Sequence, residues 1–570
     1  MANSVIIRSL VDPSQAEIVT HHSWKVTAAA YAPSGNYICS GDACGNLKIW
    51  DTLNEEHRVK YEYRPLAGDI NDIAWTHDGL RLAAVGNGRE RFSCVIAWDT
   101  GTNVGQIGGH SKSGTTVDVK PNRPFCIITG AEDYKLLHFK GPPFKYDKTL
   151  TYHSNFVNCV RYSRDGEYIA SAGSDGKIFI FNAKTCERIS ELVSEGKDKA
   201  HEGGVYAISW SPCNKKLLSA SGDKTCKIWD VPQSKCETTF IMGQQNLEDQ
   251  QLGCLWVKDH LISVSLSGRI NFLDPEHPDK LIRSYWGHKR GIICSALTKD
   301  KKFILTGSYD GTLNIWDVST GEAQVFKGPQ FSAQITAFSV FDDEITAVGV
   351  GNVIKFASTS GVTFYEDSLS TESEPLSVES IDSSRSVVGC LKYIYLLKDR
   401  KVAQCLPVSY DVLSIAVFDQ GTRVAVGATG RTVYFYKVVG DELVAEERKI
   451  TVGFDIASIS VSHSQKKLAI STTSKDVQLY DLETLGLLDK WSPQAVRVNC
   501  AVFSEDDEYL ATSGVDGSIF IICLKDRLGK LENRHAHRMY NCQKIHWINK
   551  NTIVSFGQQD CTIKFWELKF

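Results

Sequence analysis

Short apolar runs separated by turn residues follow one another along the whole chain. Residues 204–210, 216–221, 225–229 and 236–240 form one set of four such runs. The breaks at 211–214 and 222–224 contain Ser, Pro, Asn, Gly and Asp, which adopt turn geometry at low cost. No long stretch has the period of a helix. The pattern predicts an all-β protein.

The strands belong to a repeat about 40 residues long, which is the period of a WD-repeat propeller blade. The tripeptide Ile-Trp-Asp marks it most clearly, and the same position recurs at spacings of 39 to 48 residues. An earlier copy lies at residues 4–8. Rings hold about four to eight blades, so fourteen repeats predict two tandem seven-bladed propellers. The thirteen later copies of the position are Trp50, Trp98, Phe139, Phe181, Trp229, Leu273, Trp316, Phe356, Leu397, Tyr436, Tyr480, Cys523 and Trp566.

The repeat divides the chain into an N-terminal propeller at residues 1–277 and a C-terminal propeller at residues 278–570. We expect the first ring to end near the strand 270–273 and the second to begin near the strand 281–285, with a hinge at 275–278. The chain opens partway through a repeat. The first blade should therefore be short of strands, and it should leave backbone groups and apolar flanks uncovered in a weakened first ring.

Composition narrows the classes of partner. The chain of 570 residues has 63 Lys and Arg against 67 Asp and Glu, a net charge of −4. This balance favours a protein partner over nucleic acid or an anionic membrane. The N-terminus lacks the layout of a secretion signal, and no apolar run suits membrane insertion. We expect a cytosolic monomer. Its 17 cysteines form no C-x-x-C pair, so we expect reduced thiols, no structural zinc and no cofactor.

Histidine, hydroxyl and aspartate side chains recur in a set that resembles a catalytic triad. In WD-repeat proteins such residues link to the strand-closing tryptophan and satisfy buried polar atoms. Because the set is repeated blade after blade, we interpret it as structural, and no nucleophile or phosphate-binding motif points to an enzyme. His535 and His537 form an H-x-H pair without a third ligand, which we expect to be solvated rather than metal-binding. The sets are His201, Ser219, Asp223 and Trp229; His288, Thr306, Asp310 and Trp316; and His153, Ser171 and Asp175 before Phe181.

Several stretches are more distinctive than a generic blade. They are Gly-Arg-Glu-Arg-Phe at 88–92, Gly-Pro-Pro-Phe-Lys-Tyr at 141–146, Glu-Asp-Gln-Gln-Leu-Gly at 248–253, and 552–555 leading to 563–566. With these motifs, nearly the whole chain from Val5 onward resembles the actin-interacting protein 1 (WD repeat-containing protein 1) family, in an N-terminally shortened form. The resemblance implies a non-enzymatic protein of the cytoplasm and the actin cytoskeleton. It would bind filamentous actin and work with ADF/cofilin to promote severing and disassembly of filaments.

The resemblance also implies an actin- and cofilin-binding face on the first propeller. The matching positions are Glu90, Glu132, Lys145, Tyr146 and Phe156. The family usually has Asp in place of Glu132 and Phe in place of Tyr146, so affinity can differ here. From the residues alone, the Gly-Pro-Pro segment is also compatible with a solvated basic turn. An aromatic residue at the position of Phe156 is ordinarily part of the core.

Two other functions are compatible with the same fold, because fold does not determine function. The chain can be a general WD-repeat scaffold or substrate receptor for another protein complex. It can also be a propeller enzyme with a site in the ring channel, although the repeats offer no convergent set of ionisable residues for it. Filament binding with and without cofilin distinguishes the first function from both alternatives.

Overall fold

The computed structural model describes residues 3–10, 16–54, 56–89, 91–105, 107–243, 245–288, 290–526, 528–534, 536–537 and 541–570. The chain divides into two compact units, Met1–Trp286 and Gly287–Phe570. Both are built from antiparallel sheets in which strands adjacent in sequence are adjacent in space. Among the described residues, no helix combines the length and the apolar character needed to cross a bilayer.

Unit 1 contains seven sheets within its described part. They are β1 (Val5–Arg8) with β2 (Ala16–Val19); β3 (Val26–Tyr31), β4 (Tyr37–Asp42), β5 (Leu47–Asp51) and β6 (Val59–Tyr63); β7 (Ile70–Trp75), β8 (Arg81–Gly86), β9 (Ser93–Ala97) and β10 (Asn103–Gly105); β11 (Gly114–Val119), β12 (Cys126–Ala131), β13 (Leu136–Lys140) and β14 (Lys145–Leu150); β15 (Val157–Tyr162), β16 (Tyr168–Gly173), β17 (Ile178–Asn182) and β18 (Arg188–Leu192); β19 (Val205–Trp210), β20 (Lys216–Ser221), β21 (Thr225–Asp230) and β22 (Lys235–Ile241); and β23 (Gln251–Val257), β24 (His260–Ser265), β25 (Ile270–Leu273) and β26 (Leu281–Tyr285), preceded by the 3-10 turn η1 (Leu247–Asp249).

Unit 2 contains six sheets within its described part. They are β27 (Ile292–Leu297), β28 (Phe303–Ser308), β29 (Leu313–Asp317) and β30 (Ala323–Val325); β31 (Ile335–Phe341), β32 (Glu344–Gly349), β33 (Val353–Ser358) and β34 (Thr363–Ser370); β35 (Pro375–Ser380), β36 (Arg385–Lys398), β37 (Lys401–Phe418), β38 (Arg423–Ala428), β39 (Thr432–Val439) and β40 (Glu442–Thr451); β41 (Ile456–Val461), β42 (Lys467–Thr472), β43 (Val477–Asp481) and β44 (Leu487–Trp491); β45 (Val498–Phe503), β46 (Tyr509–Gly514), β47 (Ile519–Cys523) and β48 (Leu528–Asn533); and β49 (Cys542–Asn549), β50 (Thr552–Gly557) and β51 (Ile563–Glu567).

The six-stranded sheet of unit 2 spans two repeats, because β36 and β37 are long. Each of them pairs with one strand along its first half and with another along its second half. The first half of β36 pairs with β35 and its second half with the start of β37. The rest of β37 pairs with β38. Counted by repeat, the sheets therefore form two groups of seven blades. The prediction of two tandem seven-bladed WD-repeat propellers is confirmed.

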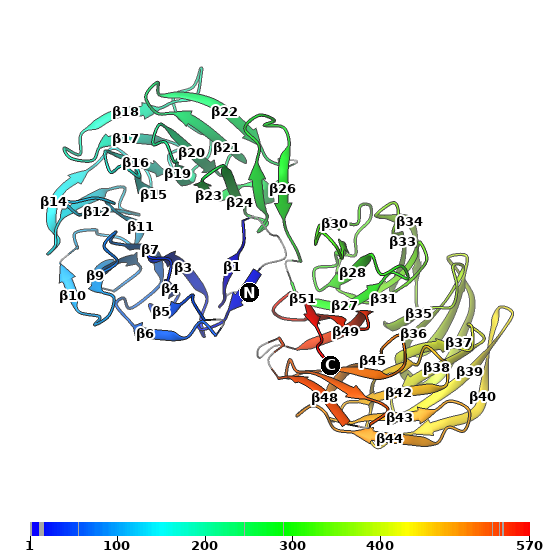
Figure 1. The fold of residues 1–570 in the computed structure, drawn as a ribbon. Helices are drawn as coiled ribbons and strands as arrows, with labels where there is room; N and C mark the ends of the chain where they lie inside the picture. The colour runs from blue at the N-terminus through cyan, green and yellow to red at the C-terminus, as the bar shows by residue number, and fades with distance from the viewer. Residues whose placement is uncertain are drawn as a thin grey trace. The chain divides into compact units, whose positions relative to one another are not determined.

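In each unit the blades stand around a ring with their first strands innermost (Figure 1). The apolar core lies between blades. Ala170 and Ala172 of β16, for example, share one buried cluster with Val205 and Trp210 of the next blade. Inner strands are also tied by side chains that donate to the backbone of the following blade. These bonds include Asn71 to Gly114 O at 2.8 Å, Asn158 to Val205 O at 2.9 Å, Thr336 to Pro375 O at 2.9 Å and Asn499 to Cys542 O at 3.0 Å.

The strand at residues 281–285 lies in a different place from the one we expected. It forms β26, the outer strand of the β23–β26 sheet, with Tyr285 opposite Ile270. We had expected this segment to begin the second ring. The division between the units falls after it, at Trp286 and Gly287, because its backbone pairs with β25.

The first blade of unit 1 has only two strands, β1 and β2, among the described residues. The neighbouring strands β3 and β24 are exposed at positions that the inner strands of a complete blade would cover. Tyr31 of β3 is 56% exposed, whereas Tyr162 at the same position of β15 is 5% exposed. On the other side, Val264 of β24 is 36% exposed, but its counterpart Ala220 is fully buried. The prediction of an incomplete first blade is confirmed.

The repeated His, hydroxyl and Asp groups are structural links inside the blades. His201 Nδ1 lies 2.9 Å from Asp223, and its Nε2 lies 2.7 Å from Ser219 Oγ. Trp229 Nε1 donates to the same hydroxyl at 2.8 Å. His201 and Ser219 are fully buried. These hydrogen bonds therefore connect the third strand of the blade, β21, to the segment that precedes its first strand, β19.

The expectation for His537 is wrong. It is fully buried and bonds Asp560 at 2.8 Å and Ser555 at 2.8 Å. Trp566 Nε1 donates to Ser555 at 2.7 Å. His537 is thus the structural histidine of the last blade and not a solvated side chain. His535 lies outside the described residues.

Candidate binding surface of unit 1

The turn between β12 and β13 carries Glu132. It is held by the neighbouring Asp133, which accepts hydrogen bonds from His110 Nδ1 at 3.1 Å and from the Ser111 N–H at 3.0 Å. Burial alone would raise the pKa of Asp133, but these donors bring it below the usual value. Asp133 therefore stays ionised and fixes the turn, while Glu132 is half-buried.

Phe156 lies at the same end of the blade, one residue before β15. Its side chain is 38% exposed, so it is not a core residue. Its ring centroid lies 5.8 Å from that of Tyr134, which is 39% exposed. Lys112 Nζ lies 5.8 Å from the Tyr134 centroid and 6.0 Å from the Phe156 centroid. Three separate turns thus present one cation and two aromatic rings, which we call the Lys112–Tyr134–Phe156 cluster.

Sequence reasoning missed Lys112 and Tyr134. Tyr134 has a detectable signal, because it follows an Asp in a turn where other repeats carry Asp-Gly, as at Gly176, Gly311 and Gly517. Lys112 has no such signal in the sequence, since the loop that carries it resembles any other polar loop. Its position above the two rings depends on the packing of neighbouring blades.

Lys145 and Tyr146 lie at the opposite end of the blade, at the start of the outer strand β14. Antiparallel strands alternate in direction, so the β13–β14 turn is at the other end from the β12–β13 turn. Both side chains are exposed, Tyr146 to 58%. Tyr146 Oη lies 2.9 Å from Thr149 Oγ1.

Phe144 anchors this second group. Its side chain is 1% exposed and packs with Ile107 in the core between two blades. Its N–H donates to Val104 O at 3.4 Å, next to a bridge to Gly105. Phe144 thus fixes the start of the outer strand β14, on which Lys145 and Tyr146 are exposed.

The structure thus separates the predicted residues into two accessible groups rather than one patch. Glu132 lies at the same end of the β11–β14 blade as the Lys112–Tyr134–Phe156 cluster, in which the predicted Phe156 comes from the connection to the next blade. Lys145 and Tyr146 occupy the other end. Glu90 lies outside the described residues.

Comparison with known proteins agrees with this architecture. The WD domain, G-beta repeat family matches residues 14–51, 144–182, 193–230, 279–317 and 489–522. WD repeat-containing protein 1 of Gallus gallus is 39% identical over 99% of this chain and 93% of its own length. The mouse protein of that name, from Mus musculus, is 40% identical over 99% of this chain and 94% of its own. Actin-interacting protein 1 of Drosophila melanogaster is 37% identical over 100% of this chain and 93% of its own.

The chain belongs to the WD repeat-containing protein 1/actin-interacting protein 1 family. The resemblance seen in the sequence motifs is therefore confirmed. The likeness extends across both propellers, including the repeats of unit 2 that have lost the tryptophan. Family membership fixes neither the binding residues nor the partners, which are considered next.

Proposed function

We propose that this protein is a non-enzymatic actin-filament-binding protein that works with ADF/cofilin to promote severing and disassembly of filaments. The main support is identity of 37% over the whole chain to a protein named actin-interacting protein 1. A protein with this role would act in the cytoplasm, at actin-rich structures of the cytoskeleton.

The surface of unit 1 suits such a partner. Exposed aromatic rings beside a cation resemble the residues that dominate binding energy at protein interfaces. The Lys112–Tyr134–Phe156 cluster supplies them at one end of the blade, and Lys145 with Tyr146 supplies a second group. Two modest contacts on one rigid body raise overall affinity when both can form together. We therefore assign both groups to the filament-binding surface.

A non-enzymatic role is supported by the state of the repeated hydroxyls. Ser219 is fully buried and is engaged by both His201 and Trp229. A nucleophile must be reachable by substrate and must have an oxyanion site beside it. The hydroxyl of Ser219 is buried and therefore does not meet the first requirement.

Cosedimentation with actin filaments, with and without cofilin, tests the proposal. Phe156→Ala should weaken cofilin-dependent binding about tenfold or more, the loss typical of an interface hot spot. Phe454→Ala is the matched control, because Phe454 is 48% exposed and stands just before β41 in unit 2. Lys145→Ala combined with Tyr146→Ala tests the second group separately.

Severing watched directly on single filaments gives the functional readout. The unmodified protein should accelerate fragmentation of cofilin-bound filaments, and Phe156→Ala should reduce the effect while Phe454→Ala does not. If the protein neither binds nor fragments such filaments, the proposal is wrong. A general scaffold for another complex is then the remaining function.

A further inference from the structure

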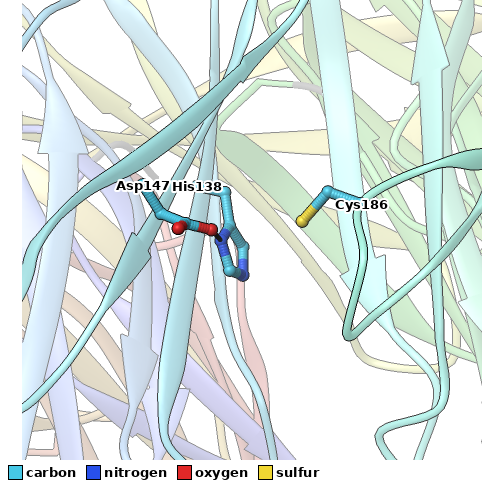
Figure 2. Close-up of side chains that lie close together, drawn as sticks. All are labelled: His138, Asp147 and Cys186. Carbon is cyan, nitrogen blue, oxygen red and sulfur yellow. Dashed lines mark hydrogen bonds and ion pairs between the residues drawn. The ribbon is translucent and has the colours of Figure 1, made fainter.

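Three chemically reactive side chains converge between two blades of unit 1. His138 comes from β13, Asp147 from β14, and Cys186 from the turn between β17 and β18. One ligand atom from each lies within 4.8 Å of the other two. Figure 2 shows the imidazole between the other two side chains, with the carboxylate on one side and the sulfur on the other. No sequence motif predicts this group, because Cys186 comes from a different blade than His138 and Asp147.

The imidazole of His138 is held in one orientation with a free nitrogen. His138 is fully buried, and its Nδ1 donates to Asp147 Oδ2 at 2.9 Å. The other carboxylate oxygen accepts from Lys140 Nζ at 2.9 Å. Nε2 is buried with no hydrogen-bond partner among the described residues. A buried nitrogen without a partner destabilises the folded state.

This arrangement is the one that metal-binding histidines show. Such a histidine donates one ring N–H to a carboxylate, which fixes the tautomer and leaves the lone pair of the other nitrogen for the ion. The Nδ1–H bond to Asp147 leaves Nε2 as the ring nitrogen that has no partner among the described residues. The lone pair of His138 Nε2 is therefore available inside the protein for a metal ion.

Cys186 offers the matching soft ligand. It is 3% exposed, and its N–H donates to Asn182 O at 2.8 Å, which closes the turn. The same buried cluster includes Tyr162, whose hydroxyl also lacks a partner among the described residues. Two unsatisfied polar groups in one apolar seam indicate that a ligand belongs there.

We propose that His138 Nε2 and Cys186 Sγ bind one soft metal ion, of the zinc(II) or copper(I) type, and that Asp147 positions the imidazole. Thiolate sulfur with imidazole nitrogen selects these ions. Zinc–nitrogen and zinc–sulfur bonds of about 2.1 and 2.3 Å place two ligands of one ion at most about 4.4 Å apart. The ligand atoms of the group lie within 4.8 Å of one another, so the group must close further around a bound ion.

Binding joins two blades. As the metal–sulfur bond forms, the thiol proton leaves to solvent, because the ligand is the thiolate. The ion then connects β13 to the turn of the neighbouring blade. It also steadies Asp147 on β14, the strand that presents Lys145 and Tyr146. Metal binding should therefore raise the stability of unit 1.

Metal content measured after stripping and reloading tests the site. The full-length protein is treated with a chelator under reducing, oxygen-free conditions, and zinc(II) or copper(I) alone is added in parallel arms. After buffer exchange, the unmodified protein should retain one more ion per chain than Cys186→Ser or His138→Asn, in the arm of the ion that fits. Its melting temperature should rise with that ion and theirs should not.

Cys126→Ser is the matched control, because Cys126 belongs to the same buried cluster but not to the ligand group. It should bind the ion as the unmodified protein does. Asp147→Asn should weaken binding roughly 10–100-fold without abolishing it, as expected for a positioning residue. Equal metal retention by the unmodified protein and a folded Cys186→Ser variant would overturn the proposal.

A spectroscopic readout covers the case in which the variants fail to fold. Cobalt(II) added to the stripped, unmodified protein should give a thiolate-to-metal charge-transfer band in the near ultraviolet. Cys126→Ser should keep that band. If no such band forms at one equivalent of cobalt(II) or, in a parallel arm, of copper(I), the sulfur is not a ligand and the proposed site does not exist.

Discussion

The ring of Tyr134 lies 5.8 Å from that of Phe156, at an interplanar angle of 39°. To reach it, Tyr134 adopts a left-handed backbone conformation with φ of 68°. The same turn position is held by glycine in several repeats, for example by Gly176 at φ 78° and Gly311 at φ 78°, but by Lys224 at φ 69° and Cys561 at φ 53° in two others. A bulky residue is disfavoured there by about 1–2 kcal/mol. Glycine is the least strained residue at this position, so the exposed tyrosine is not required by the turn, and its place in the proposed binding surface can be tested.

Tyr134→Gly should separate folding from binding. Removing the strain should leave the free energy of unfolding unchanged or raise it by about 1 kcal/mol. Loss of the exposed ring should weaken cofilin-dependent filament binding by a factor of about 5 or more. Urea unfolding and cosedimentation measure the two effects.

The reverse change at a matched turn is the control for Tyr134→Gly. Gly311→Tyr in unit 2 should lower stability, because glycine is the favoured residue at its φ of 78°. It should not improve filament binding. If Tyr134→Gly instead unfolds unit 1 and binds filaments as well as the unmodified protein, Tyr134 is a structural residue.

Phe144 should matter for stability, and Tyr146 should not. Phe144 is 1% exposed, so Phe144→Ala should cost about 3–5 kcal/mol through the cavity it leaves. Tyr146→Ala removes a side chain that is 58% exposed and should cost less than about 1 kcal/mol. Urea unfolding of the two variants tests the contrast. Similar losses for both would mean that the segment 141–146 is not anchored through Phe144.

The period of the sequence predicted much of this fold. Strand and turn positions repeat locally, so Trp50, Trp229 and Trp316 mark the ends of third strands without any tertiary information. The hydrogen-bonded sets around Ser219 and Thr306 followed from the same spacing. His537 belongs to such a set as well, at nearly the same spacings of 18 residues to Ser555 and 23 to Asp560, but the H-x-H pattern that it forms with His535 made it resemble a solvated histidine.

Contacts between blades were beyond sequence reasoning. His138 and Cys186 meet only because two sheets pack side by side, and their separation in sequence carries no signal. The same holds for Lys112 above Tyr134 and Phe156. The family motifs predicted one face, but the alternation of strand direction places Glu132 and Lys145 at opposite ends of one blade.

Because the first blade is incomplete, two tyrosines at matching strand positions should contribute unequally to the free energy of unfolding. Tyr31 and Tyr162 occupy the same position of β3 and β15, with exposures of 56% and 5%. Tyr31→Ala should cost less than about 1 kcal/mol, and Tyr162→Ala about 3–5 kcal/mol. We also expect unit 1 to unfold at lower urea concentration than unit 2, which fluorescence and limited proteolysis can follow. Equal losses for the two tyrosines would show that the flank of β3 is covered in solution.

Acid should destabilise unit 2 through His288. Burial lowers the pKa of His288 from 6.5 to about 4, and the carboxylate of Asp310, 4.0 Å away, opposes this shift only in part. Between these values the unfolded chain binds a proton that the folded chain does not, so stability rises with pH there. The stabilisation is complete above pH 6.5 and is lost as pH falls toward 4. A shift of this size corresponds to about 3 kcal/mol.

His288→Gln should remove that part of the pH dependence while preserving the fold. The last complete repeat already uses glutamine at this position, where Gln494 Nε2 donates to Thr512 Oγ1 at 2.8 Å, and Thr306 can accept in the same way. Urea unfolding at pH 4.5, 5.5 and 7 should give a shallower dependence for the variant. His277→Gln, at an exposed histidine whose pKa is raised by its hydrogen bond to Asp274 rather than lowered, should not make the dependence shallower. If His288→Gln keeps the full slope, another buried group such as His546, whose pKa burial also lowers to about 4, carries the acid sensitivity.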